Sequence, residues 1–369
     1  MGKETAYRNL RGAVAGMSDV DAAWVPIEME PPEWFVRFPP ASRNHSLRYG
    51  LVARRRLLAA EREKGPFAAA FFNHILTSLF LRDFRRRVPS VDSMDVTPIG
   101  LLEHGRAYYQ SPRGSGPAFL REAKRQYARR VFSSSAHMLP YSAFTRDSLI
   151  RDYDIPAEKI TVLPPGVDLS FWRGDRRGER QEGARPFTVL FVGEDFVRKG
   201  GDLIVNVARR QEFASARFHC VTGQFEGERP ANLTVHEGVS RNSDRLRDLY
   251  RGADVFVLPT RADFGPTNAI SEALAMGLPV IASGVGGIDE VVEDGRVGFV
   301  IPVGDSDALA QRLGQLRDDR PLRRKMAAAA RQTAEERLDV AMNTARIVET
   351  MRRVTRDAER VSPADGHCR

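Results

Sequence analysis

Residues 249–302 decide the fold, and they read LYRGADVFVLPTRADFGPTNAISEALAMGLPVIASGVGGIDEVVEDGRVGFVIP. The apolar residues 255–258 predict a strand, and the polar residues 261–268 predict the loop that follows it. A helix, a strand, a glycine turn, a second helix and a third strand then follow in order. Strands that alternate with helices in this way form a parallel α/β sheet, whose ligands bind at the loops after the carboxyl ends of the strands.

The residues around the first helix of this stretch mark where it begins and ends. Thr267 or Asn268 is suited to cap its amino end, because either side chain can accept a hydrogen bond from a backbone N–H of the first turn. Gly277 with Pro279 then ends the helix. We expect Glu272 to lie in the first turn of this short helix.

The order of these residues resembles the nucleotide-sugar-binding segment of retaining glycosyltransferases of family 4, also called group 1. The usual form in that family is a carboxylate, an FG-like loop, EAMA-G-PV and GG-EVV-DG, and this stretch contains ADFG, EALAMGLPV and GGIDEVVEDG. The resemblance implies an α/β protein of the GT-B fold, with two Rossmann-like domains facing a cleft. It also implies transfer of a sugar from a nucleotide diphosphate sugar, with retention at the anomeric carbon.

The resemblance implies roles for the residues at the start of this helix. Gly265, Pro266, Thr267 and Asn268 would form the turn whose backbone N–H groups, with the helix dipole, stabilise the donor diphosphate. Glu272 would accept hydrogen bonds from two ribose hydroxyls. The alternative for Glu272 is a helix-start carboxylate that interacts favourably with the helix dipole.

The carboxylate before the loop departs from the family pattern. The family has two glutamates separated by seven residues, whereas Phe264 lies eight residues before Glu272 and Asp263 lies nine before it. A one-residue insertion in the loop would let Asp263 take the first glutamate's place near the hydroxyls of the donor sugar. The alternative is that Asp263 forms an Asx turn.

A second block supplies the basic residues of the same site. A strand at residues 187–192 leads into Gly193, which we assign to the donor site, and then into a loop with Arg198 and Lys199. Lys199 matches the family's lysine for the diphosphate, but Glu194 stands where an arginine is usual, so Arg198 would have to supply the second cation. Two fixed cations offset the charge of a diphosphate without a metal, so we expect no metal site and no obligatory cofactor. The alternative is a solvated turn.

Two further segments belong to this predicted domain. Residues 217–223 predict a strand and a turn, and residues 232–240 predict a short strand and a loop that touches the nucleobase in the family. Those contacts are made largely by backbone atoms, so the sequence does not identify the base.

The first half of the chain predicts a second domain of alternating strands and helices. Residues 70–74 and a segment ending at SMDVTP are strand-like, and residues 119–132 predict a helix. The apolar residues 67–81 are interpreted as a buried strand and helix. Residues 136–167 predict a strand, a serine-capped helix, a turn and a short strand, and they resemble the end of the family's N-terminal domain.

The opening residues, MGKETAYRNLRGAVAG, look like the glycine turn and helix that follow a first β-strand in this fold. No strand sequence precedes them, so we expect either a first domain that lacks its first strand or a sequence that starts after it. Both alternatives weaken any acceptor contact of Gly2. Asp95, Glu103 and His104 flank a predicted strand end and are candidates to face the acceptor. Surface or turn positions are the alternative for all three.

The composition is that of an ordinary globular protein, with 42% hydrophobic and 28% charged residues among 369. Two cysteines, Cys220 and Cys368, offer neither a disulfide framework nor a metal-binding spacing. We recognise no signal peptide and no apolar run long enough to span a membrane. These features predict a cytoplasmic protein.

The formal net charge of +8 lies entirely in the first half of the chain. Residues 1–165 hold 25 Lys or Arg against 17 Asp or Glu, and residues 166–369 hold 31 of each kind. Solvated helix surface is the commonest origin of such clusters, followed by peripheral contact with an anionic membrane or a lipid-linked acceptor. We expect no nucleic acid, because no recognised binding motif accompanies the charge. The clusters are residues 54–56, 85–87 and 121–130.

Four parts are predicted: an acceptor-side Rossmann-like domain (1–165), a linker (166–186), a nucleotide-sugar-binding domain (187–337), and a C-terminal helix and tail (338–369) that return to the first domain. The predicted function is retaining transfer of a sugar to a saccharide, lipid-linked or small-molecule acceptor, in the cytoplasm or at the inner face of the membrane. The alternatives are a non-catalytic glycosyltransferase-like binding protein and a GT-B nucleotide-sugar epimerase. A nucleotide-dependent dehydrogenase is disfavoured, because residues 284–287 are not a dinucleotide fingerprint after a first strand.

Overall fold

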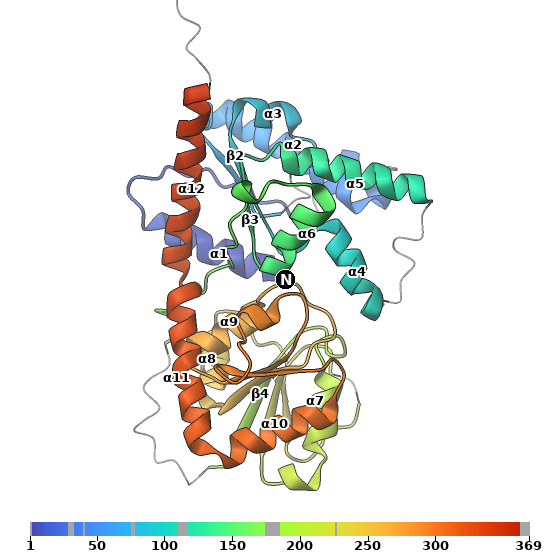
Figure 1. Cartoon of the computed structure of the whole chain (residues 1–369), viewed down its shortest axis with the longest axis vertical. Helices are drawn as coiled ribbons and strands as arrows, with labels where there is room; N and C mark the ends of the chain where they lie inside the picture. The colour runs from blue at the N-terminus through green and yellow to red at the C-terminus, as the bar shows by residue number, and fades with distance from the viewer. Residues whose placement is uncertain are drawn as a thin grey trace, which may run out of the picture. The chain divides into compact units, whose positions relative to one another are not determined.

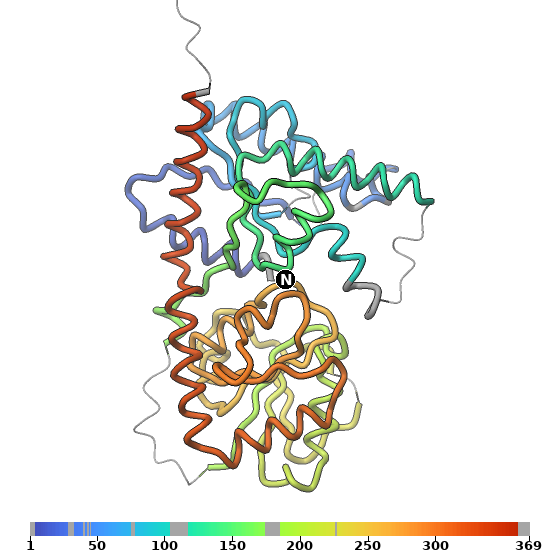
Figure 2. Tube along the Cα trace, in the orientation of Figure 1, coloured from blue at the N-terminus to red at the C-terminus, as the bar shows by residue number. Residues whose placement is uncertain are grey.

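The chain divides by its internal contacts into two units, each with its own parallel sheet (Figures 1 and 2). We name them the six-stranded unit, which contains Met1–Leu10, Leu102–Ser111 and Pro164–Asn343, and the three-stranded unit, which contains Arg11–Leu101, Pro112–Leu163 and Thr344–Arg369. The computed structural model describes residues 2–28, 33–39, 41–74, 78–109, 117–173, 185–225 and 227–361.

The sheet of the six-stranded unit is parallel throughout, with strand order β6-β5-β4-β7-β8-β9. Its central strands are short apolar runs, as expected of a parallel sheet covered on both faces. The order of the strands reverses between β4 and β7, which makes their carboxyl ends the topological switch point of the sheet. The strands are β4 Thr188–Val192, β5 Arg217–Val221, β6 Leu233–His236, β7 Val255–Leu258, β8 Val280–Ser283 and β9 Gly298–Ile301.

Two groups of helices cover this sheet (Figure 1). One group pairs α7 with α10, and the other pairs α9 with α11, while a hydrogen bond links α8 to α9. The helices are α7 Gly201–Ala208, α8 Asp244–Gly252, α9 Asn268–Ala275, α10 Ser306–Asp318 and α11 Arg320–Arg337, with short 3₁₀ turns η6 Gln211–Phe213 and η7 Ile288–Glu290.

A side-chain cap and a glycine set the two ends of α9, as predicted. The Thr267 hydroxyl accepts a hydrogen bond from Ile270 N at 3.3 Å and caps the amino end. Gly277 follows the last turn with a φ of 66°, and Leu278 N donates back to Ala273 O at 2.9 Å. The predicted start and stop of this helix are therefore confirmed.

Large apolar side chains from neighbouring strands fill the core of the six-stranded unit. Phe191, Phe218 and Phe256 are fully buried there. Cys220 lies on β5 in the same core as a free cysteine, and burial raises the pKa of its thiol to about 12. A core of this kind holds the strand ends in place, and with them the loops that carry the candidate site.

The three-stranded unit has a parallel sheet in the order β1-β2-β3. Its strands are β1 Ala70–Phe72, β2 Ser90–Met94 and β3 His137–Pro140. Its helices are α2 His45–Lys64, α3 Arg82–Arg87, α5 Ala118–Ser133, α6 Ala143–Tyr153 and most of α12 Val340–Val361, with 3₁₀ turns η1 Trp34–Arg37, η2 Ala41–Arg43 and η4 Ala157–Lys159. Three of the described helices have residues in both units, namely α12, α1 Gly2–Ala15 and α4 Pro98–Tyr109.

A buried ion pair joins α3 to β2 in this unit. Arg85 donates to the two carboxylate oxygens of Asp92 at 2.6 and 2.7 Å, and its guanidinium lies 5.0 Å from the centre of the Phe72 ring. Ser135 donates a further hydrogen bond to the same carboxylate. Loss of either charged partner would leave the other charge buried and alone, which destabilises a protein strongly. The basic cluster at residues 85–87 is therefore not entirely a surface cluster.

Most predicted elements are confirmed, and four differ in detail. The second helix predicted after the glycine turn of residues 249–302 is only the 3₁₀ turn η7. The short strand predicted before residue 167 is replaced by two isolated bridges, between Met138 and Ile160 and between Val167 and Asp339. The described residues of 67–81 contain β1 and turns, and the next helix begins only at Arg82. The last helix spans Val340–Val361, so it begins two residues after the predicted start at residue 338, and its residues from Thr344 onward belong to the three-stranded unit.

No helix among the described residues is both long and apolar enough to cross a membrane.

Candidate functional site

The carboxyl ends of β4 and β7 lie side by side and carry the two loops with the predicted donor-site residues. The strands pair directly, with Leu190 opposite Phe256. The loop after β4 contains Arg198 and Lys199, and the loop after β7 contains Asp263. Because the strand order reverses at this point, this edge is where an open α/β sheet offers room for a ligand.

An ion-pair cluster joins these two loops. Lys199 Nζ donates to the two oxygens of Asp263 at 2.8 and 2.7 Å. Arg198 Nη1 lies 3.4 Å from Asp263 Oδ1 and donates to Ala262 O at 2.7 Å, while its Nε donates to Asp195 Oδ2 at 2.8 Å. The side chains of Arg198, Lys199 and Asp263 are only 18%, 14% and 12% exposed. Three residues predicted from segments more than 60 positions apart thus form one charged cluster.

Two glycines set the position of the Asp263 loop. Gly265 N donates to Gly286 O at 2.6 Å, so Asp263 does not form the alternative Asx turn to this N–H. Gly286 has a φ of 59°, and a Cβ atom there would lie 2.0 Å from Asp263 O. Only glycine allows this close approach without strain.

Two of the four residues predicted to form the anion-binding turn cannot donate a backbone N–H to a diphosphate. The N–H of Gly265 is bound to Gly286 O, and Pro266 has no N–H. Thr267 and Asn268 stand at the start of α9, where the helix dipole favours an anion. The predicted anion-binding turn therefore loses the backbone N–H donors of Gly265 and Pro266.

Glu272 lies in the second turn of α9, not in the first turn as predicted, because the helix begins at Asn268. The residue is 4% exposed, and its Oε2 accepts a hydrogen bond from the Tyr250 hydroxyl at 2.9 Å. Burial raises the pKa of Glu272 to about 8, against the lowering effects of the Tyr250 bond and of Arg241. The alternative of a helix-start carboxylate is therefore also wrong.

Gly193 brings the strand end close to the lysine. A Cβ atom at Gly193 would lie 2.8 Å from the Phe191 ring and 2.9 Å from Lys199 Cβ. Gly200 has a φ of 81°, and a Cβ atom there would lie 2.2 Å from Pro259 O. The two glycines on either side of this loop therefore let it approach both β4 and the end of β7.

A bidentate ion pair that was not predicted supports the same loops. Arg261 donates to both oxygens of Asp202 at 2.7 Å and to Val197 O at 2.5 Å. This arrangement ties the loop after β7 to the first turn of α7, behind the charged cluster. Sequence reasoning missed it because the two partners are 59 positions apart and neither belongs to a motif.

The acceptor-side candidates lie after β2 and on α4. Asp95 directly follows β2, where its carbonyl accepts from Thr145 Oγ1 at 2.6 Å and its carboxylate accepts from Val96 N at 3.1 Å. Glu103 lies on α4, and the side chain of His104 lies outside the described residues. The hydrogen bonds of Asp95 fit the turn role that was its alternative.

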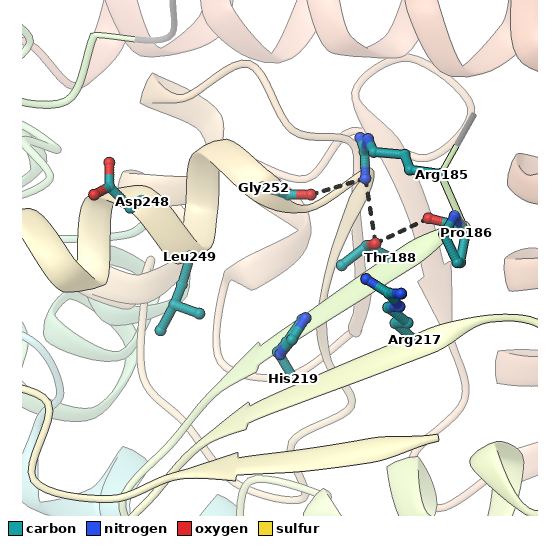
Figure 3. A pocket seen from close by; sticks show the side chains of 8 residues that line it. All are labelled: Arg185, Pro186, Thr188, Arg217, His219, Asp248, Leu249 and Gly252. Carbon is teal, nitrogen blue, oxygen red and sulfur yellow. Dashed lines mark hydrogen bonds between the residues drawn. The ribbon is translucent and has the colours of Figure 1, made fainter. Parts of the chain in front are cut away.

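A cavity of about 280 Å³ lies at the opposite ends of two strands of the six-stranded unit (Figure 3). Thr188 and Arg217, the first residues of β4 and β5, line it together with Arg185, His219 and residues of α8. Arg185 donates to Gly252 O at 3.0 Å and pairs with Asp254 at 2.7 Å. This cavity is therefore separate from the charged cluster, which follows the carboxyl ends of the strands.

Comparison with known families identifies both halves of the chain. Residues 186–319 match the family described as "Glycosyl transferases group 1", and residues 27–171 match the family described as "Glycosyltransferase Family 4". The chain belongs to these glycosyltransferase families. The curated relatives of this family member include the D-inositol 3-phosphate glycosyltransferase of Nocardia farcinica, 31% identical over 55% of this chain and 49% of that protein. A second is D-inositol 3-phosphate glycosyltransferase 1 of Catenulispora acidiphila, 29% identical over 63% and 59%. The chain thus covers between 49% and 59% of the length of these two relatives.

Solved structures of glycosyltransferases share the fold, which is GT-B. The sucrose-phosphate synthase of Thermosynechococcus elongatus is similar with a TM-score of 0.72 and 17% identity, over 95% of this chain and 93% of that one. Anabaena HepE in complex with UDP is similar with a TM-score of 0.63 and 17% identity, over 82% of both chains. At this level of identity the likeness establishes the fold alone.

Proposed function

We propose that this protein transfers a sugar from a nucleotide diphosphate sugar to an acceptor, with retention at the anomeric carbon. The charged cluster of Arg198, Lys199 and Asp263 at the switch point of the sheet carries the proposal. The N–H groups at the start of α9 add a second source of positive potential. Cations and helix-start amides at one strand edge suit a diphosphate leaving group.

In this proposal the bond between the anomeric carbon and the diphosphate oxygen breaks while the bond to the acceptor oxygen forms. The acceptor hydroxyl gives its proton to the leaving diphosphate. An ammonium group has three N–H donors, and Asp263 uses two of those on Lys199, which leaves one for a phosphate oxygen. Asp263 would thus hold Lys199 in place and lie near the hydroxyls of the donor sugar.

UDP is the first nucleotide to test as part of the donor. Structures of Anabaena HepE contain UDP or UDP-glucose, and a TarM structure also contains UDP. The acceptor panel should begin with inositol phosphates, because these appear in the names of the curated relatives. Saccharides and lipid-linked sugars complete the panel.

Of the three basic clusters, the one at residues 121–130 supports the finer proposal of contact with an anionic membrane. The Arg54–Arg56 segment is engaged within its own unit, since Arg56 pairs with Glu33 at 2.7 Å and Arg55 lies over the ring of Phe35 at 5.3 Å. Helix α5 instead exposes basic and apolar side chains together. Phe119 is 70% exposed and Leu120 is 45% exposed, beside exposed Arg121 and Lys124. Such a surface suits a lipid interface, and we propose that the protein works in the cytoplasm at the inner face of the membrane.

Isothermal titration with UDP tests the donor site through Lys199→Ala. We expect the variant to bind UDP roughly tenfold or more weakly, because a hydrogen bond to a charged group contributes about 1.5–3 kcal/mol. Lys325→Ala is the matched control, since Lys325 is an exposed lysine on α11 of the same unit and should leave UDP affinity unchanged.

Two results would contradict the proposal. The first is a wild-type protein that binds none of UDP, GDP, ADP and dTDP. The second is equal UDP affinity in wild type and Lys199→Ala, which would remove this lysine from the donor site. Release of UDP from a UDP-sugar that depends on an added acceptor would separate transfer from epimerisation and from binding without catalysis.

A further inference from the structure

The carboxylate of Glu272 is hydrogen-bonded to a tyrosine that belongs to an aromatic cluster inside the six-stranded unit. The Tyr250 hydroxyl, from α8, donates to Glu272 Oε2 at 2.9 Å and lies 3.1 Å from Ala269 O. A tyrosine hydroxyl carries one proton, and the carboxylate is the nearer and stronger acceptor. The Tyr250 ring is fully buried between Trp172 and Phe256, at centroid distances of 5.3 and 5.7 Å.

This contact fixes one oxygen of the carboxylate and leaves the other for a ligand. Oε2 is held by Tyr250, whereas no residue in the described part of the chain donates to Oε1. The ring packing leaves the hydroxyl little freedom, because a large buried aromatic side chain cannot change rotamer without disturbing its neighbours. The orientation of the Glu272 carboxylate is thus set by Tyr250, which lies 22 positions earlier on another helix.

The same contact acts on the charge of the carboxylate. Burial favours the neutral acid and raises the pKa of Glu272, and the hydrogen bond from Tyr250 opposes this effect. Burial and the neighbouring Glu272 raise the pKa of Tyr250 well above its usual value, so Tyr250 keeps its proton and remains a donor. Tyr250 therefore favours the ionised form of Glu272, which accepts hydrogen bonds from two hydroxyls and which becomes the main form above a pH of about 8.

We propose that Tyr250 is a positioning residue that orients Glu272 toward the ribose hydroxyls of the nucleotide donor. This inference rests on the proposed function, since it requires a nucleotide in the site. It assigns to a buried tyrosine of α8 a part in selecting ribonucleotides over their 2′-deoxy counterparts.

The test compares the affinities of UDP and 2′-deoxy-UDP by isothermal titration in wild type and in Tyr250→Phe. Wild type should prefer UDP by about tenfold or more, because a site built to bind a hydroxyl rejects an analogue that lacks it. Tyr250→Phe should bind UDP roughly tenfold more weakly but bind 2′-deoxy-UDP nearly as wild type does. Tyr153→Phe is the matched control, since Tyr153 is a fully buried tyrosine of the other unit whose hydroxyl accepts from Ile99 N. It should leave both affinities unchanged.

A second variant keeps the test decisive if Tyr250→Phe does not fold. Glu272→Gln leaves the tyrosine in place and should also lose the preference for UDP, and the double variant should lose no more than either single one. A Tyr250→Phe protein that keeps the full preference, or that loses both ligands equally, would overturn the inference. So would a wild type that binds the two nucleotides alike. A wild type that binds neither nucleotide would instead count against the proposed function.

Discussion

Gly286 controls how closely two loops of the candidate site approach each other. A Cβ atom there would lie 2.0 Å from Asp263 O, and the backbone has a φ of 59°. We predict that Gly286→Ala lowers the free energy of unfolding and weakens UDP binding by roughly tenfold, because the displaced loop carries Asp263 away from Lys199.

The control variant Gly304→Ala separates the effect of backbone strain at a positive φ from the effect of a Cβ atom that clashes with the Asp263 loop. Gly304 has a φ of 79°, but a Cβ atom there meets nothing within 4 Å. Its substitution should cost only the backbone strain of a left-handed alanine, about 1–2 kcal/mol, with UDP affinity unchanged. Urea unfolding and titration calorimetry give both quantities. Equal losses of UDP affinity in the two variants would refute a local effect on the site.

Glu272 makes the stability of the six-stranded unit depend on pH. Its pKa is raised by burial to about 8, from an ordinary value of 4.5, so between these values the folded chain holds a proton that the unfolded chain has lost. The free energy of unfolding therefore falls as pH rises through this window. The groups that act on this carboxylate are Tyr250 and Arg241, and the latter is paired with Glu4 at 3.6 Å.

We predict that Glu272→Gln removes this fall in stability. The difference in unfolding free energy between the variant and wild type should move in favour of the variant from pH 5 to pH 8.5, as measured by urea unfolding at each pH. Glu228→Gln, at a side chain that is 90% exposed, should show the same pH dependence as wild type. If the unfolding free energies of all three proteins change with pH in parallel, Glu272 is already ionised in the folded state at pH 5.

At the scale of single residues, sequence motifs indicate which residues lie at the candidate site but not which of them contact one another. Lys199, Arg198 and Asp263 could be chosen from the sequence, yet the bidentate contact between Lys199 and Asp263 spans 64 positions and follows only from the adjacency of β4 and β7. The use of the Gly265 N–H by Gly286 was unpredictable for the same reason. Partners across a crossover depend on the fold, which a local pattern does not encode.

At the scale of elements, α9 combines a structural cap with a candidate anion site. We predict that Thr267→Ala costs about 1 kcal/mol of stability through loss of the cap and also weakens UDP binding, because the amino end of α9 faces the proposed diphosphate. Ser243→Ala removes the equivalent cap of α8, where Leu246 N donates to Ser243 Oγ at 3.2 Å. It should cost similar stability and leave UDP affinity unchanged. A loss of affinity in both variants, or in neither, would contradict the prediction.

Helices and strands could be predicted where the sequence carries a clear local pattern of apolar, capping or terminating residues. The apolar run of β7, the cap at Thr267 and the glycine stop of α9 all appear as local signals. The residues before Val167 were less predictable, because their apolar pattern fits a strand. In the described structure they make an isolated bridge at Ile160 and backbone hydrogen bonds from Thr161 and Leu163 to β3, but no regular strand. Whether an extended segment becomes a strand depends on an available neighbour.

At the scale of the whole molecule, the excess of basic residues in the first half predicts attraction to anionic lipid. We predict that Arg121→Gln with Lys124→Gln, in the exposed first turns of α5, reduces sedimentation with phosphatidylserine vesicles at low salt. Each basic residue near an anionic surface contributes about 1 kcal/mol, and salt screens this contribution. Phe119→Ala should reduce binding further, at low and at high salt alike.

The control for this experiment changes the same charges elsewhere. Arg324→Gln with Lys325→Gln replaces two exposed basic residues on α11 in the six-stranded unit and should leave vesicle binding unchanged. UDP affinity should stay as in wild type for both double variants. A wild-type protein that remains in the supernatant at low salt would make α5 an ordinary solvated helix.

The two-sheet organisation could be predicted from the alternation of strands and helices, but the use of the basic clusters could not. Arg85 reads as part of a surface cluster in RRR, yet it is buried against Asp92 because α3 packs beside β2. A count of charged residues in the sequence therefore does not show which of them are exposed in the folded protein.

Cys220 gives the six-stranded unit a built-in probe of its own opening. A thiol that is buried in β5 and almost fully protonated reacts with an alkylating reagent only when the sheet opens around it. In a chain with Cys368→Ser, the rate of alkylation would therefore report how often this unit opens under native conditions. A nucleotide that binds only the closed unit would slow that reaction as its concentration rises, so a single cysteine can report donor binding with no assay of sugar transfer.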